Sequence, residues 1–290
     1  PMTRVAELMA GGIDLVTELS PDNVALLRDD ARFRVQEQTG PHLWFLILNT
    51  REGPCRDRRV RQALNYAVDK QALVEHVLQG TATVAAGPVP AAFDWAHDAG
   101  LRPYAHDPAR ARSLLRQAGY EGGLTLRLLT PTSGSGMLAP VRMAAAIQGD
   151  LAKVGIAVTI ETYEWNTYLA KVNRGLAGQA DMAEMAWMTN DPDTLPYLAL
   201  RSGALPAQGG FNSGYYESPR VDALIERARA SVDRAERARL YRELHRAVHE
   251  DAPWLFVASW RQNAVATRAL RGFALEPSFF LLLHSAYKRQ

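Results

Sequence analysis

Residues 156–172 read IAVTIETYEWNTYLAKV, and within this stretch the chain changes from a strand pattern to a helix pattern. The part 156-IAVTIET-162 is typical of a β-strand. The following segment, 164–174, places its large apolar side chains three and four positions apart, as on one face of a helix: Trp165, Tyr168, Leu169 and Val172. A strand followed directly by a helix is the repeating unit of an α/β fold.

The same alternation continues on both sides of this stretch. It predicts a strand at 124-LTLRLLT-130, a helix over 137–153 and a strand at 181-DMAEMAW-187. Strand–helix–strand–helix–strand predicts the α/β class, with a parallel core and right-handed connections. Ligands on such sheets bind beyond the carboxyl ends of the strands. The loops 130-TPTSGSGM-137 and 188-MTNDPDT-194 are therefore candidate binding loops.

Further helices and strands are expected around this core. Helices are predicted over 3–10 and from Ser20-Pro21, Asp57, Asp69, Asp107-Pro108, Ser218-Pro219 and Asp233, where capping residues stand. Strands are predicted at 13–16, 33–38, 43–49, 254–259 and 264–267. Residues 81–106 hold three prolines and no clear period. A loop of that length is usually functional or wraps over a surface.

Composition narrows the class of protein. A chain of 290 residues can form one large domain or two ordinary ones. A net charge of +2 gives no reason to expect nucleic acid or a membrane surface as partner. The single cysteine, Cys55, excludes an intramolecular disulfide and a site with several cysteines. No secretory signal stands at the start, so we expect a mature protein or a piece of a longer one.

Five segments together carry a family resemblance. They are 59-RVRQALNYAVDKQALVEHVLQGTATVAAGPVP-90, 106-HDPARARSLLRQAGY-120, 151-LAKVGIAVTIETYEWNTYLAKV-172, 212-NSGYYESPRVDALIERA-228 and 236-ERARLYRELHRAVHEDAPWLFV-257. In order and spacing the chain resembles solute-binding proteins of ABC importers, family 5, the oligopeptide/dipeptide-binding type. The resemblance implies a two-lobed fold of the periplasmic-binding-protein type (type II, cluster C) that closes on its ligand.

The resemblance also implies that the N-terminal half of the family's fold is missing. Residues 1–50 then correspond to the last part of lobe I, 51–255 to lobe II, and 256–290 to a segment returning to lobe I. With one wall of the cleft absent, we expect weak or no ligand binding by this chain, and micromolar or tighter binding by a full-length form. The family further implies a monomer without cofactor, delivery to the transmembrane subunits of an ABC permease, and a periplasmic or extracellular, membrane-associated location.

Asp191 and Asp193 flank Pro192 directly after the strand that ends in Trp187. A glycosidase-like pair needs two carboxylates that face each other across a substrate, which one short loop does not provide. A calcium loop would need further ligands and a trailing glutamate. Two interpretations stay open. Asp191 caps a helix that begins at Pro192, or these acids contact a ligand directly.

The anchors of the dipeptide-binding members are not evident. Such members pair the ligand's ammonium group with an acid a few residues ahead of the Asp-Pro-Asp, where this chain has Met188, Thr189 and Asn190. They grip the ligand carboxylate with an arginine after the first strand of the lobe, where this chain has Ser133 in a Gly-Ser loop. Backbone and hydroxyl donors of that loop are one alternative anion site, and simple flexibility is the other. A strict dipeptide receptor is therefore disfavoured.

The predicted ligand contacts are Ser133, Trp187, Thr189, Asn190, Asp191, Asp193, Asn212 and Tyr215. Trp187 is expected to form an aromatic platform at the ligand edge of the sheet.

His245 and His249 have metal-ligand spacing, but Arg246 replaces the glutamate of a zincin, so a solvated helix face is the simpler interpretation. Cys55 has no evident base partner. We predict a non-enzymatic receptor for peptides or related small polar solutes. The rivals are a receptor for a metal chelate, an oligosaccharide or a glutathione-like peptide, a hydrolase using Asp191, and a lobe that binds nothing alone.

Overall fold

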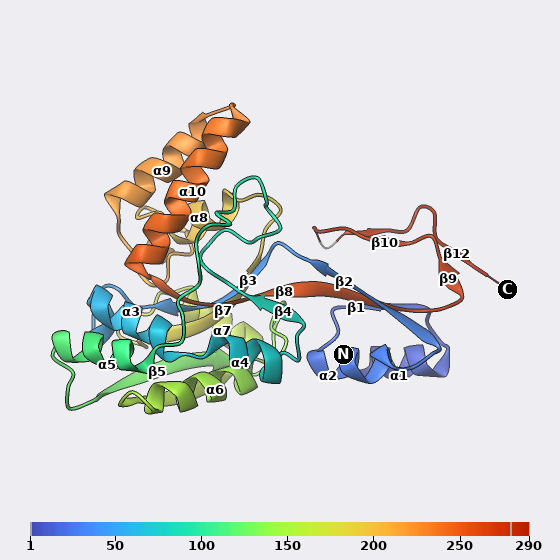
Figure 1. Cartoon of the computed structure of the whole chain (residues 1–290), viewed down its shortest axis with the longest axis horizontal. Coiled ribbons are helices and arrows are strands. Elements are labelled where there is room, and N and C mark those ends of the chain that lie inside the picture. Colours follow the sequence, from blue (N-terminus) through green and yellow to red (C-terminus); the bar gives the residue numbers. More distant parts are fainter. Residues whose placement is uncertain (1, 279, 290) are drawn as a thin grey trace.

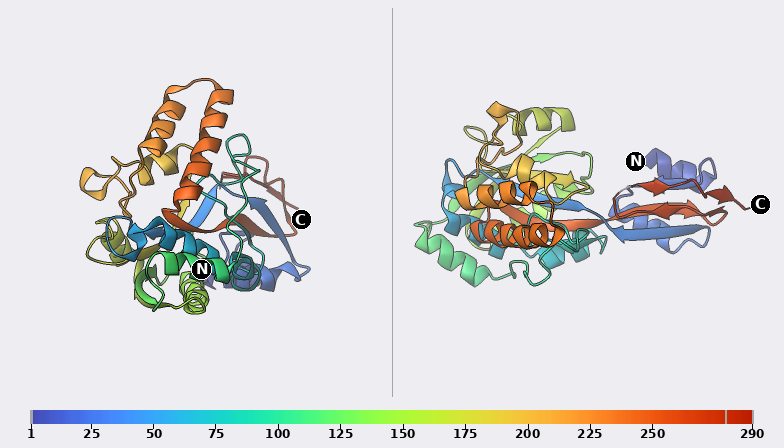
Figure 2. Two further views of the ribbon diagram at one scale, coloured as in Figure 1. Left: turned by 60° about the vertical axis from the view of Figure 1, so that its left-hand side comes forward. Right: turned by 90° about the horizontal axis from the view of Figure 1, so that it is seen from above.

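The computed structural model describes residues 2–278 and 280–289. Pro1, Phe279 and Gln290, which belong to the first and last of the expected lobe segments, lie outside the described residues. The chain forms a larger body of helices around a sheet and a smaller, extended body that holds both ends of the chain (Figure 1). Seen from above, the two bodies are joined by a narrow region of strands (Figure 2).

The predicted parallel core is confirmed. Strands β5 (Leu124–Pro131), β6 (Ile156–Tyr163) and β7 (Met182–Met188) are parallel, with β5 in the middle. They are linked by α6 (Pro140–Ala152) and α7 (Trp165–Val172). The sheet continues with β3 (His42–Leu48), which is antiparallel to β7, and with β8 (Trp254–Thr267), which is antiparallel to β3. The α/β class is therefore confirmed, and the sheet is mixed.

Both faces of this sheet are covered by helices. Strand β3 is buried along its whole length, and its side chains alternate between two hydrophobic cores. Trp44, Leu46 and Leu48 pack with α3 (Arg58–Ala67), α5 (Pro108–Gln117) and α6. The other side chains pack with α7, α8 (Thr194–Ala199), α9 (Pro219–Ala230) and α10 (Arg234–Asp251). Figure 1 shows α8, α9 and α10 on one side of the sheet and α3, α5 and α6 on the other.

Most helix starts follow the capping residues. The side chains of Asp57, Asp107, Ser218 and Asp233 each accept a hydrogen bond from a backbone N–H two or three residues further on. The helix predicted from Asp69 is different: α4 (Lys70–Ala72) passes into a π-turn over Leu73–Val77. The wider turn is closed by the Leu78 N–H, which donates to the Leu73 carbonyl (3.0 Å).

The prediction of separate strands at 254–259 and 264–267 is wrong, because β8 is one strand of 14 residues. Its first part pairs with β3 and β4 (Ala82–Val84), and its second part pairs with β1 (Leu15–Thr17) and β2 (Phe33–Thr39). Polar residues interrupt the apolar pattern between the two predicted pieces, yet Asn263 is buried. Its side-chain amide exchanges hydrogen bonds with the Leu19 backbone (2.9 and 3.1 Å), which removes the penalty of burying it.

The smaller body is a sheet covered by two helices on one face. Helices α1 (Met2–Ala10) and α2 (Pro21–Arg28) contribute Val5, Leu8, Val24 and Leu27 to its core, together with Val265 of β8. Two short pairs of antiparallel strands complete it: β9 (Leu270–Arg271) with β12 (Tyr287–Lys288), and β10 (Ala274–Leu275) with β11 (Leu281–Leu282). Among the described residues, no helix is both long and apolar enough to cross a bilayer.

An acidic side chain is buried in the larger sheet. Glu184 of β7 is 1% exposed, and the indole N–H of Trp44 donates to its Oε1 (2.8 Å). The Tyr168 hydroxyl donates to the Glu184 backbone carbonyl from the other face of the sheet. Burial raises the pKa of Glu184 well above its usual value, because a carboxylate loses its hydration there. Burial therefore favours the neutral acid over the carboxylate in the folded protein.

This raised pKa predicts a pH-dependent loss of stability. When the pKa of a carboxyl group is higher in the folded than in the unfolded state, where it is about 4.3, the group stabilises the fold fully below pH 4.3. This contribution to the free energy of unfolding is lost as the pH rises. Glu184→Gln keeps the oxygen that Trp44 needs and does not titrate. We expect the variant to exceed the wild type in free energy of unfolding at pH 8 by about 1–3 kcal/mol, the cost of desolvating a buried polar group. The difference should shrink towards pH 4.5.

Urea denaturation between pH 4.5 and pH 8 measures this. The exposed Glu121→Gln is the matched control and should follow the wild type. An unchanged pH dependence in Glu184→Gln would contradict the assignment.

Candidate functional site

Two cavities meet at the loop between β5 and α6. The first, called the Trp187 cavity, has a volume of about 340 Å³ and is lined by His42, Ser135, Gly136, Trp165, Leu169, Asn173, Met185, Ala186, Trp187, Met188 and Phe211. The second, called the junction cavity, has about 440 Å³ and lies between the two bodies. It is lined by Arg4, Glu18, Ser20 and Asp22 of the smaller body, by residues 132–142, and by Trp260. Ser135 and Gly136 belong to both.

Two glycines allow this loop to form the shared wall. A Cβ atom at Gly134 would lie 2.4 Å from the ring of Trp165. Gly136 has a φ of +72°, and a Cβ there would lie 2.7 Å from Nε2 of His42. Only residues without a side chain can approach both rings this closely. The Gly-Ser composition of the loop therefore has a packing reason.

The Trp187 cavity is apolar and uncharged. The rings of Trp187 and Phe211 are in edge contact, with centroids 5.2 Å apart. His42 is fully buried and packs edge-on against Trp260 at 4.8 Å. Burial lowers the pKa of His42 to about 3, although a hydrogen bond with the Gly136 backbone acts in the opposite direction. The imidazole is therefore neutral at pH 7, and the cavity suits an uncharged group.

The junction cavity contains charges of both signs. Arg142 of α6 and Asp22 of α2 form an ion pair across it (2.8 Å). Arg4 and Glu18 also line it, and neither has an ion-pair partner among residues 2–278 and 280–289. The predicted contact Ser133 is exposed and lines this cavity. A cation, an anion and hydroxyl groups are therefore available to a polar solute at the junction.

Asp191 and Asp193 face helices of their own body. Asp191 Oδ1 accepts the Asp193 N–H (2.8 Å), which closes a local turn, and its other oxygen lies 3.8 Å from Arg237 of α10. Asp193 pairs with Arg229 of α9. Burial nevertheless raises the pKa of Asp193, because desolvation outweighs the attraction of the guanidinium group. The expected helix start at Pro192 is wrong: α8 begins at Thr194, because the Asp191 carboxylate fixes a turn before it.

Two further residues of this loop differ in exposure. Thr189 is buried, and its N–H donates to the Pro41 carbonyl (3.3 Å), which ties the loop to the start of β3. Asn190 is exposed. Neither residue lines the Trp187 cavity, whose wall in this segment ends at Met188. A ligand contact by either residue stays a prediction.

The side chains of Asn212 and Tyr215 make contacts within the protein. The Asn212 side chain is buried, donates to the carbonyls of Arg201 and Tyr216 and accepts the Tyr216 N–H (2.9 Å), so its amide is fully used. The Tyr215 ring stacks on Arg51 at 3.8 Å, near the carboxyl end of β3. Because β3 and β7 are antiparallel, that end adjoins the amino end of β7, whereas Trp187 is near the carboxyl end.

The structure adds neighbours that the sequence pattern did not single out. Phe211 directly precedes Asn212, and His42 begins β3. Trp165 and Leu169, which the sequence pattern places on one helical face, both line the Trp187 cavity. Their spacing of four positions was a signal for one helical face. It gave no information on which cavity that face would meet.

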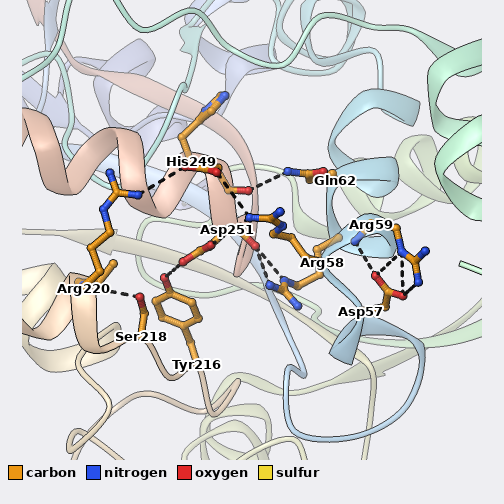
Figure 3. A network of polar contacts seen from close by, with 12 residues as sticks. Asp57, Arg58, Arg59, Gln62, Tyr216, Ser218, Arg220, His249 and Asp251 are labelled. Atoms are coloured by element: carbon orange, nitrogen blue, oxygen red, sulfur yellow. Dashed lines mark hydrogen bonds and ion pairs between the residues drawn. The ribbon is translucent and has the colours of Figure 1, made fainter. Parts of the chain in front are cut away.

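A second polar cluster lies where α10 ends (Figure 3). The Tyr216 hydroxyl donates to Asp251 Oδ2 (2.5 Å), and Arg58 lies 3.8 Å from the other oxygen. Gln62 donates to the Glu250 carbonyl (2.8 Å), and the buried Arg61 donates to the Asp251 carbonyl (2.8 Å). These contacts fasten α3 and the 206–218 loop to the helix end. Among the described residues, no group of three His, Cys, Asp or Glu side chains is placed to hold a metal ion.

Comparison with known proteins gives the family. A sequence profile described as "Bacterial extracellular solute-binding proteins, family 5 Middle" matches residues 1–207. The chain is 33% identical to heme-binding protein A of Haemophilus influenzae over 278 residues, which are 95% of this chain and 50% of that protein. It is 32% identical to the dipeptide-binding protein of Escherichia coli over 277 residues, covering 94% and 51%.

Solved structures agree with this result. The periplasmic binding protein DppA of Helicobacter pylori, in complex with the peptide STSA, superposes with a TM-score of 0.85 at 28% identity. The match covers 100% of this chain and 55% of that one. The chain thus spans about half the length of the relatives it matches. The profile covers well over half of the chain, and the fold agrees along its whole length, so this chain belongs to the bacterial extracellular solute-binding proteins of family 5.

Proposed function

We propose that this chain is the ligand-binding part of an ABC-importer receptor that captures a peptide or a related small polar solute. The observation that carries the proposal is the pair of cavities on either side of the 132–139 loop, at the junction of the two bodies. Both lie at the carboxyl ends of parallel strands, where sheets of this class bind ligands. The role is that of a binding protein and not of an enzyme.

Capture would proceed by closure of one lobe on the other. A solute in the junction cavity touches α1 and α2 on one side and the 132–142 segment on the other. Such a ligand stabilises the closed state, because only there does it contact both walls. The division into residues 1–50 and 256–290 of lobe I and 51–255 of lobe II stays a prediction.

The charged ends of the solute would be bound at the junction. Asp191 and Asp193 are already paired with arginines of α9 and α10, so neither offers an unopposed charge to an ammonium group. Glu18 and Arg4 are better placed for an ammonium and a carboxylate, respectively. An ion in a closed cleft needs an opposite charge, because burying it alone is costly.

The apolar group of the solute would enter the Trp187 cavity. Its volume of about 340 Å³ lies at the lower end of the range of small-molecule sites. The relatives bind solutes as different as heme and dipeptides. A non-peptide solute with a planar apolar group is therefore the second candidate, because Trp187 and Phe211 form an aromatic wall. Metal chelates, oligosaccharides and glutathione-like peptides remain within the same class.

Partners and location follow from the family. We propose delivery to the transmembrane subunits of an ABC permease, from a periplasmic or extracellular position, by a monomeric receptor without a cofactor. Nucleic acid is not an expected partner, because the net charge is only +2.

A receptor returns its ligand unchanged. We expect that a form of the protein that includes the remainder of lobe I, mixed with a peptide library, retains intact peptides in a one-to-one ratio, as measured by mass spectrometry after gel filtration. Steady accumulation of cleaved peptides, abolished by Asp191→Asn, would instead support the hydrolase alternative.

The aromatic wall should set the preference for apolar side chains. Phe211 is 37% exposed, so Phe211→Gln should fold normally. We expect it to weaken binding of Ala-Phe-Ala about tenfold, or about 1.4 kcal/mol, with little effect on Ala-Gly-Ala. Isothermal titration calorimetry on the longer form measures both. Phe280→Gln, at a 63% exposed position of the smaller body, is the matched control. Equal losses for both peptides would contradict this role of Phe211.

Completion of the cleft should increase affinity. We expect the 290-residue chain to show little ligand-induced thermal stabilisation, and a form that includes the remainder of lobe I to show the shift that micromolar or tighter binding produces. Differential scanning fluorimetry with the same ligand series compares them. Equal shifts would refute the need for a second wall.

A further inference from the structure

Residues 85–106, between β4 and α5, contain no helix or strand and are called the strap. Figure 1 shows the strap as the teal loop beside α10, and in the left view of Figure 2 it again lies next to this helix. Long loops without secondary structure need specific contacts to stay ordered. In the strap several of these contacts are made by histidines.

Three histidine rings hold the strap. His97 Nδ1 lies 2.8 Å from the Val89 carbonyl within the strap, and His249 Nδ1 of α10 lies 2.7 Å from the Ala86 carbonyl. His245 of α10 is fully buried under Gly87. A Cβ atom at Gly87 would lie 2.2 Å from the His245 ring, so only glycine fits there.

Aromatic contacts complete the attachment. The Tyr104 hydroxyl donates to the His249 carbonyl (2.6 Å), and the two rings stack with centroids 4.2 Å apart. The rings of His97 and His245 are 5.1 Å apart. The three imidazoles are therefore neighbours within one interface between the strap and α10.

The groups around these rings offer no free negative charge that could compensate a protonated imidazole. The titratable and charged groups that face the rings come from the strap, from α10 and from α4: His97, Asp98, Tyr104, His245, Arg246, His249 and Lys70. Within the described residues, Asp98 is the one carboxylate in this set, and Arg246 already pairs with it (2.5 Å). Lys70 is buried, and its ammonium group donates to Asn65 (3.1 Å). A proton added here meets mostly positive or neutral groups.

We propose that the strap is a pH-sensitive latch: it is closed on α10 while His245 and His249 are neutral, and it opens when they are protonated. Opening would bring both imidazoles into water, where a charged ring is hydrated. The inference needs no ligand and is independent of the proposed function.

The proton affinities of the closed state agree with this geometry. Burial, together with the positive charges that the neighbouring His97 and His249 can carry, lowers the pKa of His245 to about 3. Burial also lowers the pKa of His249. The two neutral histidines therefore stabilise the closed strap fully when the pH is above about 6.5, the pKa of a histidine in water. This stabilisation is lost as the pH falls below that value.

Release of the strap would also affect the junction of the two bodies. The strap follows directly on β4, whose Ala82 pairs with Trp260 of β8. The Thr81 carbonyl accepts the Arg261 N–H (2.8 Å) at the point where β8 passes into the smaller body. An open strap removes one support of this strand.

Hydrogen–deuterium exchange of the full 290-residue chain tests the latch directly. Protection of peptides covering 85–106 is measured at pH 7.5 and pH 5.0, corrected for intrinsic exchange, with α6 peptides as internal reference. We expect strap opening to increase about thirtyfold or more at pH 5.0, the factor for one histidine that is neutral when closed and has a pKa of about 6.5 when open. Less than a threefold change would overturn the proposal.

Variants separate the latch from general acid destabilisation. His245→Phe keeps a ring under Gly87 and cannot be protonated, so the pH effect on the strap should decrease about thirtyfold. His76→Phe, at an exposed position, should behave as wild type. Equal pH effects in both variants would refute the role of His245. Should His245→Phe not fold, NMR titration of ¹⁵N-histidine-labelled wild type decides: protonation of His245 with the strap still protected would overturn the proposal.

Discussion

The structure depends on one continuous strand, β8. Its first part is hydrogen-bonded to β3 and β4 in the larger body, and its second part to β1 and β2 in the smaller one. The second passage between the bodies, Gly40-Pro41, lies between β2 and β3, the two strands that β8 pairs with in succession. Both passages are therefore side by side, and the closure that we propose has to bend the chain there. The junction cavity, with Trp260 in its lining, lies at the same level.

Burial keeps several titratable groups uncharged in this fold. Burial lowers the pKa of His42 beneath the 132–139 loop and of His245 beneath the strap, and it raises the pKa of Glu184 in the sheet. The cause is the same in each case, because desolvation disfavours the charged form. The consequences differ in sign: the histidines favour folding at higher pH, and the glutamate favours it at lower pH.

The candidate cleft separates apolar from ionic recognition. The Trp187 cavity has no charged lining residue, whereas the junction cavity has charges of both signs, and the glycines of the shared loop set the distance between them. The acids next to Trp187 contribute to structure, through the turn at Asp191 and the pair of Asp193 with Arg229. A solute with an apolar group and charged ends would match this separation. It would be held differently from a ligand gripped by an acid and an arginine of the larger lobe.

The sequence by itself determined the elements whose causes are local. The strand patterns depend only on neighbouring residues, at 124–130 and at 156–162. The same holds for the helical spacing of Trp165 and Leu169 and for the caps at Asp107 and Ser218. The α/β core was therefore predictable. The resemblance carried by five segments added the family. Tertiary structure alone decided the union of β8, which requires a buried Asn263 satisfied by Leu19, 244 positions away. It also decided that the Asn212 side chain hydrogen-bonds the backbone of its own loop and that the ring of Phe211 contacts that of Trp187. These outcomes rest on contacts between residues distant in sequence, which no local pattern encodes.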